Sequence, residues 1–278
     1  NTIYSQTSTF TGLGTENITI SGETNNSLAA SVLNTLNGNT TGNINADTVT
    51  TLTGSITDLN TAYTASAATG DGISNLGNEA ITLSDTSVTD VAALNTLNGN
   101  TTGNIDAGTN VTSFTGSISD LNTMFATKAA SGDGISFSSS SGAADQTVTI
   151  TDTTDVSVTG LTTLNGHTTG NIDASGVTSL ASASISDIKT LLTNGNNHTN
   201  NFTSTSFNDL ATVAVSGTSI SVADLNDSIT QANTATTDPT TTVFSVSSGA
   251  TITTGDEAAF TTLRTNETNG NIAITDQN

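Results

Sequence analysis

The feature that most constrains the fold is a twelve-residue segment that recurs along the chain. It reads LNTLNGNTTGNI at residues 33–44 and again at 94–105, and LTTLNGHTTGNI at residues 161–172. A shortened copy, LRTNETNGNI, covers residues 263–272. The three full copies begin 61 and 67 residues apart. Stacked repeat proteins have periods of roughly 20 to 50 residues, so a spacing of this length predicts two structural turns in each sequence repeat.

The repeat also predicts how the chain is divided. Its segments are 1–17, the tail of a preceding module; 18–80, 81–147 and 148–192, three repeat modules; and 193–278, diverged modules. Asn1–Tyr4 reads like Asn60–Tyr63, which predicts that the chain starts inside a module of a longer polypeptide. In the diverged part, residues 194–201 are interpreted as a polar loop, and Pro239 marks a second irregular stretch.

Short strands are predicted where apolar and polar residues alternate. The first module has Ile18–Ser21, and the later copies of this strand are Ile81–Ser84 and Val148–Thr151. A second strand, Gly103–Asp106, follows the helix of its module. In the diverged part the same pattern predicts strands at 243–246, 251–253 and 272–274, with a helix at 257–264.

Between the strands, the apolar residues change to helical spacing. The predicted apolar stripes are Leu28, Val32 and Leu36; Val88, Val91, Leu94 and Leu97; Val49 to Tyr63; Phe114 to Phe125; and Leu180, Ile185, Ile188 and Leu192. The first helix of each module is expected to end at an Asn-Gly pair, which tolerates the left-handed conformation of a helix end. Gly54 and Gly116 predict a break just before the second helix.

A Ser followed three residues later by Asp recurs at five places. The pairs are Ser55 and Asp58, Ser117 and Asp120, Ser184 and Asp187, Ser206 and Asp209, and Ser221 and Asp224. A serine hydroxyl can accept a backbone N–H at a helix start, and a nearby carboxylate favours the positive end of the helix dipole. We therefore interpret these Asp residues as helix caps in preference to catalytic or metal-binding groups.

Alternating strands and helices imply a parallel sheet with right-handed connections. Two architectures satisfy this pattern: a solenoid, in which each short strand stacks on the one before, and a compact doubly wound sheet. Central and edge strands of a compact sheet face different surroundings, so near-identical modules favour the α/β solenoid. The chain has no Trp, 2 Tyr and 8 Phe, which suits the thin aliphatic core of stacked turns.

The charge balance excludes two classes of partner. The chain has 24 acidic and 3 basic residues, a net charge of −21. Three basic side chains are too few to neutralise the phosphates of a nucleic acid. We therefore expect no nucleic-acid binding and no attraction to an anionic membrane surface. No apolar run reaches about 18 residues, so no membrane span is predicted.

Several phrases together resemble the repeats of very large, Thr-rich, Lys-poor surface proteins of cyanobacteria and other aquatic bacteria. These phrases are LNTLNGNTTGNI, VTTLTGSITDLNTAY and LGNEAITLSDTS, and about a fifth of the chain is Thr. The resemblance covers residues 1–192 well and the remainder poorly. It implies a secreted protein of the S-layer, adhesin or extracellular-filament type, located at the cell surface, and it carries over no catalytic residues.

Calcium is the cofactor that the sequence leaves open, because Ca²⁺ binds carboxylate and backbone oxygens. The candidate ligands are acidic residues near the ends of predicted strands: Asp85, Asp106, Asp152, Asp155 and Asp173. If these strand ends stack, their carboxylates form a ladder that a cation would stabilise. Neither a calcium-binding nonapeptide nor an EF-hand loop is present, and the alternative is that each Asp is a turn residue.

The residues indicate no enzyme. His167 and His198 are the two histidines, and His167 replaces the Asn found at Asn39 and Asn100 in the sister copies. With no Cys, the usual zinc ligand sets cannot form, and no phosphate-binding loop is present.

We therefore predict a non-catalytic structural segment of a secreted, self-assembling cell-surface protein, whose partners are further copies or modules of itself. A glycan- or host-binding adhesin or phage fibre module is the alternative, and exposed aromatic residues gathered on one face would favour it.

Overall fold

The computed structural model describes residues 14–21, 26–66, 72–127, 134–137, 145–197, 201–203, 205–233, 241–253 and 255–274. Eight helices lie in these residues: α1 (Ala30–Asn37), α2 (Ile56–Ser66), α3 (Val91–Asn100), α4 (Ile118–Ala126), α5 (Val158–His167), α6 (Ile185–Asn197), α7 (Val222–Ala232) and α8 (Glu257–Thr268). Tyr4, His198 and Pro239 lie outside the described residues.

Short strands alternate with these helices along the chain. The first ten are β1 (Ile18–Thr19), β2 (Ser27–Ala29), β3 (Ile44–Asn45), β4 (Thr51–Gly54), β5 (Ile73–Ser74), β6 (Ala80–Leu83), β7 (Ser87–Val88), β8 (Asn104–Asp106), β9 (Ser113–Gly116) and β10 (Gly134–Ser136). The others are β11 (Thr147–Ile150), β12 (Ile172–Asp173), β13 (Ser179–Ser184), β14 (Thr212–Ser216), β15 (Ser219–Ser221), β16 (Val243–Val246), β17 (Thr251–Thr253) and β18 (Ile272–Ile274). The predicted strands at 243–246, 251–253 and 272–274 are confirmed.

The chain divides into two compact units. The first consists of Asn1–Phe114 and Thr123–Gly142, and the second of Thr115–Asn122 and Ala143–Asn278. In the first unit, β1-β3-β5 and β10-β8-β6-β4-β2 form parallel sheets and β7 pairs with β9. In the second, β11 pairs with β12, β13-β14-β16-β18 form one parallel sheet, and β15 pairs with β17. The predicted α/β class, with parallel strands alternating with helices, is confirmed.

The strand registers line up apolar side chains of the same kind. In the first unit the aligned column contains Leu28, Leu52, Ile81, Ile105 and Ile135, all of them buried. In the second unit Leu180, Val213, Phe244 and Ile272 form the equivalent column. Because full burial of one such side chain stabilises the fold by about 1.5 to 3 kcal/mol, these columns form the core.

Each helix buries a narrow stripe against the sheet. The fourth residue is fully buried in seven helices: Leu33, Leu59, Leu94, Leu121, Leu161, Ile188 and Leu225. The stripe predicted for the first helix is wrong in part, since α1 buries Ala30, Leu33 and Leu36. Val32 is 41% exposed and Leu28 belongs to β2. The predicted stripe and the observed stripe both have helical spacing. Because β2 ends at Ala29, the helix begins at Ala30, and this start determines which residues face the sheet.

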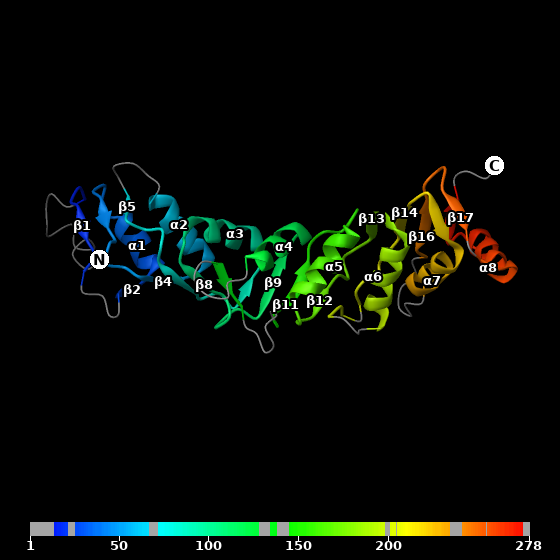
Figure 1. Cartoon of the computed structure of the whole chain (residues 1–278). Helices are drawn as coiled ribbons and strands as arrows, with labels where there is room; N and C mark the ends of the chain where they lie inside the picture. Colours follow the sequence, from blue (N-terminus) through cyan, green and yellow to red (C-terminus); the bar gives the residue numbers. More distant parts are fainter. Residues whose placement is uncertain are drawn as a thin grey trace. The chain divides into compact units, whose positions relative to one another are not determined.

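Successive helices are held together by one recurring hydrogen bond, which we call the helix joint. In α1, α2, α4 and α7 the fifth residue is Asn, and its side-chain amide donates to the backbone carbonyl of the third residue of the following helix. The bonds are Asn34 to Asp58 (2.9 Å), Asn60 to Ala93 (2.9 Å), Asn122 to Gly160 (3.0 Å) and Asn226 to Ala259 (2.9 Å). Figure 1 shows α1, α2 and α3 side by side in the first unit, and α6, α7 and α8 side by side in the second.

The repeated Thr-Thr-Gly segment fastens each loop to the loop before it. The Thr101 hydroxyl donates to the Glu79 carbonyl (3.1 Å) and accepts from the Gly103 N–H (2.9 Å). Thr40 makes the same two contacts with Glu16 and Gly42. A Cβ at Gly103 would lie 2.0 Å from the Glu79 carbonyl oxygen, which is closer than any side chain allows. The sequence therefore needs glycine here, and we call this arrangement the Thr-Gly clasp.

The predicted helix caps are confirmed at four of the five Ser-x-x-Asp pairs. Ser55, Ser117, Ser184 and Ser221 each accept the backbone N–H three residues later, at 3.1 to 3.3 Å. The fifth prediction is wrong, because Ser206 begins no helix. Its hydroxyl donates to the Ile172 carbonyl and accepts from the Ala174 N–H, so it bonds to the backbone at the end of β12.

Several boundaries also differ from the prediction. Of the helices expected to end at an Asn-Gly pair, α1 does so, with Gly38 in the right-handed conformation, whereas α3 and α5 continue through the pair and end at Asn100 and His167. The polar segment 194–201 was predicted to be a loop, yet α6 continues through Asn194 to Asn197. The last helix ends at Thr268, four residues beyond the predicted end. Both extensions consist of polar residues, which carry little apolar periodicity.

Candidate functional site

Two of the five calcium candidates cap helices. The Asp85 carboxylate accepts the backbone N–H of Ile56, the first residue of α2, at 2.8 Å. The Asp152 carboxylate accepts the N–H of Ile118, the first residue of α4, at 2.6 Å. Each Asp follows a strand and reaches back to the preceding helix, so its charge lies at the positive end of that helix dipole.

Of the other three candidates, Asp106 and Asp173 are the last residues of β8 and β12 and bond to the turns that follow, and Asp155 lies in a bend. The Asp106 carboxylate accepts the N–H groups of Gly108 (2.8 Å) and Thr109 (3.0 Å) and the Thr109 hydroxyl (2.6 Å). The Asp173 carboxylate accepts the Ser175 N–H at 2.9 Å. Asp155 has a positive φ of 51°, a conformation that Asp tolerates better than most residues, and its N–H donates to the Ser179 hydroxyl.

The carboxylates do not gather into a metal centre in the part of the chain that the structure describes. No three His, Cys, Asp or Glu side chains there lie close enough to hold a metal ion together. Calcium binding between the carboxylates of the five candidate residues stays a prediction.

One carboxylate side chain, that of Glu79, is fully buried in the first unit. One of its carboxylate oxygens, Oε2, accepts three hydrogen bonds: from the Tyr63 hydroxyl (2.9 Å) and from the N–H groups of Gly77 (2.8 Å) and Asn78 (3.2 Å). The other oxygen, Oε1, is buried without a hydrogen-bond partner. Glu79 thus organises the loop between β5 and β6 and connects it to α2.

Tyr63 is the one side chain among the three donors to the Glu79 carboxylate. Burial raises the pKa of its hydroxyl well above the usual range; a hydrogen bond with Thr101 lowers the pKa, and the Glu79 charge raises it further. The hydroxyl therefore remains a hydrogen-bond donor at physiological pH. Because Tyr63 and Glu79 are both buried, the pair positions the chain and offers no open face to a substrate.

Sequence reasoning treated this segment only as a loop and missed the role of Glu79. A signal was present, because Gly and Glu have the same spacing at Gly14 and Glu16. There the Glu16 carboxylate accepts the N–H groups of Gly14 (2.7 Å) and Thr15 (3.1 Å), as Glu79 does in its own loop.

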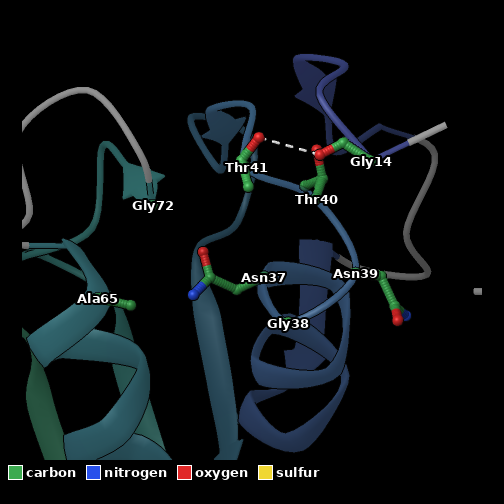
Figure 2. A pocket seen from close by; sticks show the side chains of 8 residues that line it. All are labelled: Gly14, Asn37, Gly38, Asn39, Thr40, Thr41, Ala65 and Gly72. Carbon is green, nitrogen blue, oxygen red and sulfur yellow. Dashed lines mark hydrogen bonds between the residues drawn. The ribbon is translucent and has the colours of Figure 1, made fainter. Parts of the chain in front are cut away.

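A hollow of about 450 Å³ lies beside the first clasp, at the C-terminal ends of α1 and α2. Gly14, Asn37, Thr41, Ala65 and Gly72 are among its lining residues, and Figure 2 shows the bond from Thr41 to Gly14 at its rim. None of its lining residues is titratable. The hollow therefore offers hydrogen bonds and carries no group for acid–base or nucleophilic chemistry.

A second hollow, of about 360 Å³, lies in the second unit between α4 and the segment that leads into α5. Asp152, Asp155 and Asn122 contribute to its walls. Two of these polar groups already hold the backbone, since Asp152 caps α4 and Asn122 forms a helix joint to Gly160. This hollow brings two calcium candidates to one place, but a third acidic ligand is not among its lining residues.

His167 and Lys189 are two further ionisable groups among the described residues. His167 is the last residue of α5. Lys189, the fifth residue of α6, donates to the carboxylates of Asp224 (2.7 Å) and Asp227 (2.8 Å) in α7. Lys189 therefore takes the place of Asn in the helix joint, with a carboxylate as its acceptor in place of a backbone carbonyl.

Comparisons with known proteins give no further guide. No protein-family model, curated protein or solved structure matches the chain. None of the helices in the described segments has the length and apolar character needed to cross a bilayer.

Proposed function

We propose that the chain is a solenoid with about two turns in each repeat of 61 to 67 residues. The support is the short reach of its strand pairing. Paired residues in all the ladders described above lie 24 to 33 positions apart, so each strand bonds to the strand of the next turn. In repeat proteins each unit contacts its neighbours alone, whereas a compact doubly wound sheet brings distant segments together.

The proposed function is structural. We infer a non-catalytic segment of a secreted, self-assembling cell-surface protein, of the S-layer or extracellular-filament type. The observation that carries this proposal is the helix joint, which repeats the same side-chain bond between successive helices in both units. A chain that uses its recurring polar groups to fix one turn on the next is suited to rigid extension.

The polar side chains support the same proposal. Glu79, Asp85 and Asp152 all bond to backbone groups, and the Glu79 site is closed to solvent. Low positive charge and abundant Thr and Asn suit a soluble surface in salt water.

Two measurements on the purified chain test the proposal. Small-angle scattering should give a radius of gyration well above the roughly 19 Å of a compact domain of this length. Electron micrographs at increasing concentration should show sheets or filaments. A radius near the compact value would contradict the solenoid.

The micrographs separate the structural role from its alternatives. Dispersed particles that bind a glycan array would contradict the structural role and favour the adhesin. Order that disappears on adding a chelator and returns with Ca²⁺ would establish calcium as part of the assembly.

A further inference from the structure

Five Asn-Gly pairs occur in the chain, and the structure gives them different surroundings. They are residues 37–38, 98–99, 165–166, 194–195 and 269–270. In four of the pairs the next residue is Asn as well, so Asn37, Asn98, Asn194 and Asn269 each begin the tripeptide Asn-Gly-Asn. A difference in chemical reactivity among these four is therefore an effect of the fold.

An Asn-Gly pair can react within itself, because glycine has no side chain to hinder its backbone nitrogen. The Gly nitrogen gives up its proton and attacks Cγ of the Asn side chain. The N–Cγ bond forms, the Cγ–Nδ2 bond breaks, and Nδ2 leaves as ammonia with that proton. Water then opens the resulting succinimide ring at either carbonyl carbon, which gives Asp or isoaspartate. During the first step, negative charge develops on the Asn Oδ1.

The pairs in the three full repeat copies keep this oxygen away from solvent. Oδ1 of Asn37, Asn98 and Asn165 is buried and has no hydrogen-bond partner among the described residues. Negative charge on a buried oxygen without donors is costly. In enzymes, removal of a single donor to such an oxyanion slows the reaction by roughly 100- to 1000-fold, which indicates the scale of the effect.

Helical structure adds a second barrier. Gly99, Gly166 and Gly195 lie inside α3, α5 and α6. The N–H of Gly38, just after α1, donates to the Asn34 carbonyl at 3.0 Å. Such a bond must break before the nitrogen can attack. Each of α1, α3 and α5 is held by three buried apolar residues, so opening of its last turn is unfavourable.

Asn269 differs in exposure and in anchoring. Asn269 and Gly270 are both exposed, and the Asn269 Oδ1 is not one of the buried oxygens. The Gly270 N–H donates to the Glu267 carbonyl at 3.0 Å, at the end of α8. Because α8 is held by one buried residue, Leu263, its last turn opens more easily than the last turns of α1, α3 and α5.

We propose that Asn269 is a site of spontaneous deamidation through a succinimide, and that the fold protects the Asn-Gly pairs of the three full repeat copies from the same reaction. Water is the co-reactant, and Asp and isoaspartate are the products. An isoaspartate at this position is a substrate for enzymes that methylate isoaspartyl carboxylates. This inference does not depend on the proposed structural role.

Deamidation here would change the turn that leads into β18. The Asn271 N–H donates to the Asn266 carbonyl at 2.9 Å, and the next residue, Ile272, pairs with Phe244 of β16. Isoaspartate adds one methylene to the backbone inside the loop that this hydrogen bond closes. Both products also add a carboxylate to a chain with a net charge of −21. We therefore expect the modified chain to hold β18 less firmly on β16.

The test follows all five pairs in the unmodified, folded chain. The chain is incubated in mildly alkaline buffer made with heavy-oxygen water and then digested, and mass spectrometry measures the label at each Asn. Asn269 should react about tenfold faster than Asn37, Asn98 and Asn165, which corresponds to about 1.4 kcal/mol of activation free energy. Asn194, inside α6, should also react more slowly than Asn269. Part of the product at Asn269 should accept a methyl group from an isoaspartyl methyltransferase.

The same incubation in concentrated guanidinium chloride is the control for the fold. In the unfolded chain the four Asn-Gly-Asn tripeptides should react at similar rates. A matched variant, Asn269→Gln, would have to close a larger ring, so it should lose the label at this position and keep the rates of the other pairs. Circular dichroism should confirm that the variant keeps its secondary structure.

Three results would overturn the inference. In the folded chain, Asn269 could react no faster than Asn98, although the two begin the same tripeptide. The rates at Asn37, Asn98 and Asn165 could stay the same on unfolding, which would reject protection by the fold. A product that is Asp alone, without isoaspartate, would reject the succinimide. None of these results bears on the structural role, which the micrographs test separately.

Discussion

Two helix joints, one in each compact unit, use different side chains at the same place. Between α2 and α3, the Asn60 amide donates to the Ala93 carbonyl. Between α6 and α7, Lys189 donates to the Asp224 and Asp227 carboxylates. Both contacts start from the fifth residue of a helix, but one is a hydrogen bond from a neutral amide and the other is an ion pair. A neutral amide and an ion pair at one position should differ in their response to pH and salt.

The loops that contain Glu79 and Gln146 also differ in side-chain chemistry at an equivalent position. The clasp in the first unit uses Glu79, a fully buried carboxylate, whereas the corresponding loop of the second unit has Gln146, which is also buried. The backbone requirement is shared, since a Cβ at Gly103 or at Gly170 would lie 2.0 Å from the carbonyl oxygen of Glu79 or Gln146. The two units thus agree in backbone geometry and differ in charge.

The largest effect is expected at the shared backbone requirement. Gly103→Ala should lower the free energy of unfolding by about 3 kcal/mol, because the new Cβ would meet the Glu79 carbonyl and the clasp would have to open. Gly99→Ala is the matched control, since no atom lies within 4 Å of its Cβ and Ala is favoured in a helix. Urea denaturation should show a large loss for the first variant and none for the second; equal effects would mean that the clasp is not a constraint.

The next effect concerns the charged and neutral versions of the buried loop. Glu79→Ala should cost about 2 to 3 kcal/mol, because the Tyr63 hydroxyl and two buried N–H donors lose their acceptor. Glu79→Gln keeps an acceptor and reproduces the side chain of Gln146, so we expect a much smaller loss. Thermal unfolding would measure both. A Gln variant as unstable as the Ala variant would show that the charge itself is required.

These comparisons indicate what the sequence could predict. The order of strands and helices could be predicted because near-identical copies sample the same pattern several times. The Asn of the helix joint was visible in the copies at 33–44 and 94–105, yet its role requires knowing which carbonyl the next helix presents. Glu79 and Ser206 were misjudged for a related reason: a polar residue in a loop gives no sign of its burial or of its backbone partner.

The calcium candidates show the same limit. Their placement near strand ends could be predicted, but Asp85 and Asp152 reach helices that begin 29 and 34 residues earlier in the chain. Only the pairing of the strand before each helix with the strand that carries the Asp creates that contact. The N-terminal face of α1 was likewise misplaced because Val32 and Leu33 fit alternative stripes equally well.

A smaller effect is expected at the helix caps that Asp85 and Asp152 form. Asp152→Ala should lower the free energy of unfolding by about 1 kcal/mol, since the Ile118 N–H loses its acceptor at the start of α4. Asp47→Ala removes the same charge from an exposed turn and should change little. The helix α6 lacks this cap, because the strand register places Gly217 where α2 and α4 have an Asp. Urea denaturation of both variants would measure the difference. Equal losses would show that the negative charge matters and that its hydrogen bond to the Ile118 N–H does not.

The smallest effect returns to the two helix joints. Lys189→Asn would give α6 the side chain used by α2, and at neutral pH it should change stability by less than about 1 kcal/mol, as is usual for a partly exposed ion pair. At high pH the stability of the unmodified chain and that of the variant should respond differently. The hydrogen bonds to Asp224 and then Asp227 raise the pKa of Lys189 from 10.5 to about 12.

The sign of that pH dependence follows from linkage. Because the folded-state pKa is the higher one, the stabilisation by Lys189 is fully present below pH 10.5 and is lost as the pH rises through about 12. Tyr63, whose pKa burial also raises, lowers stability over the same range in both chains. Its contribution cancels when the variant is subtracted from the unmodified chain. The difference in unfolding free energy should therefore shrink between pH 10 and 12, and a constant difference would show that the charge of Lys189 plays no part in its joint.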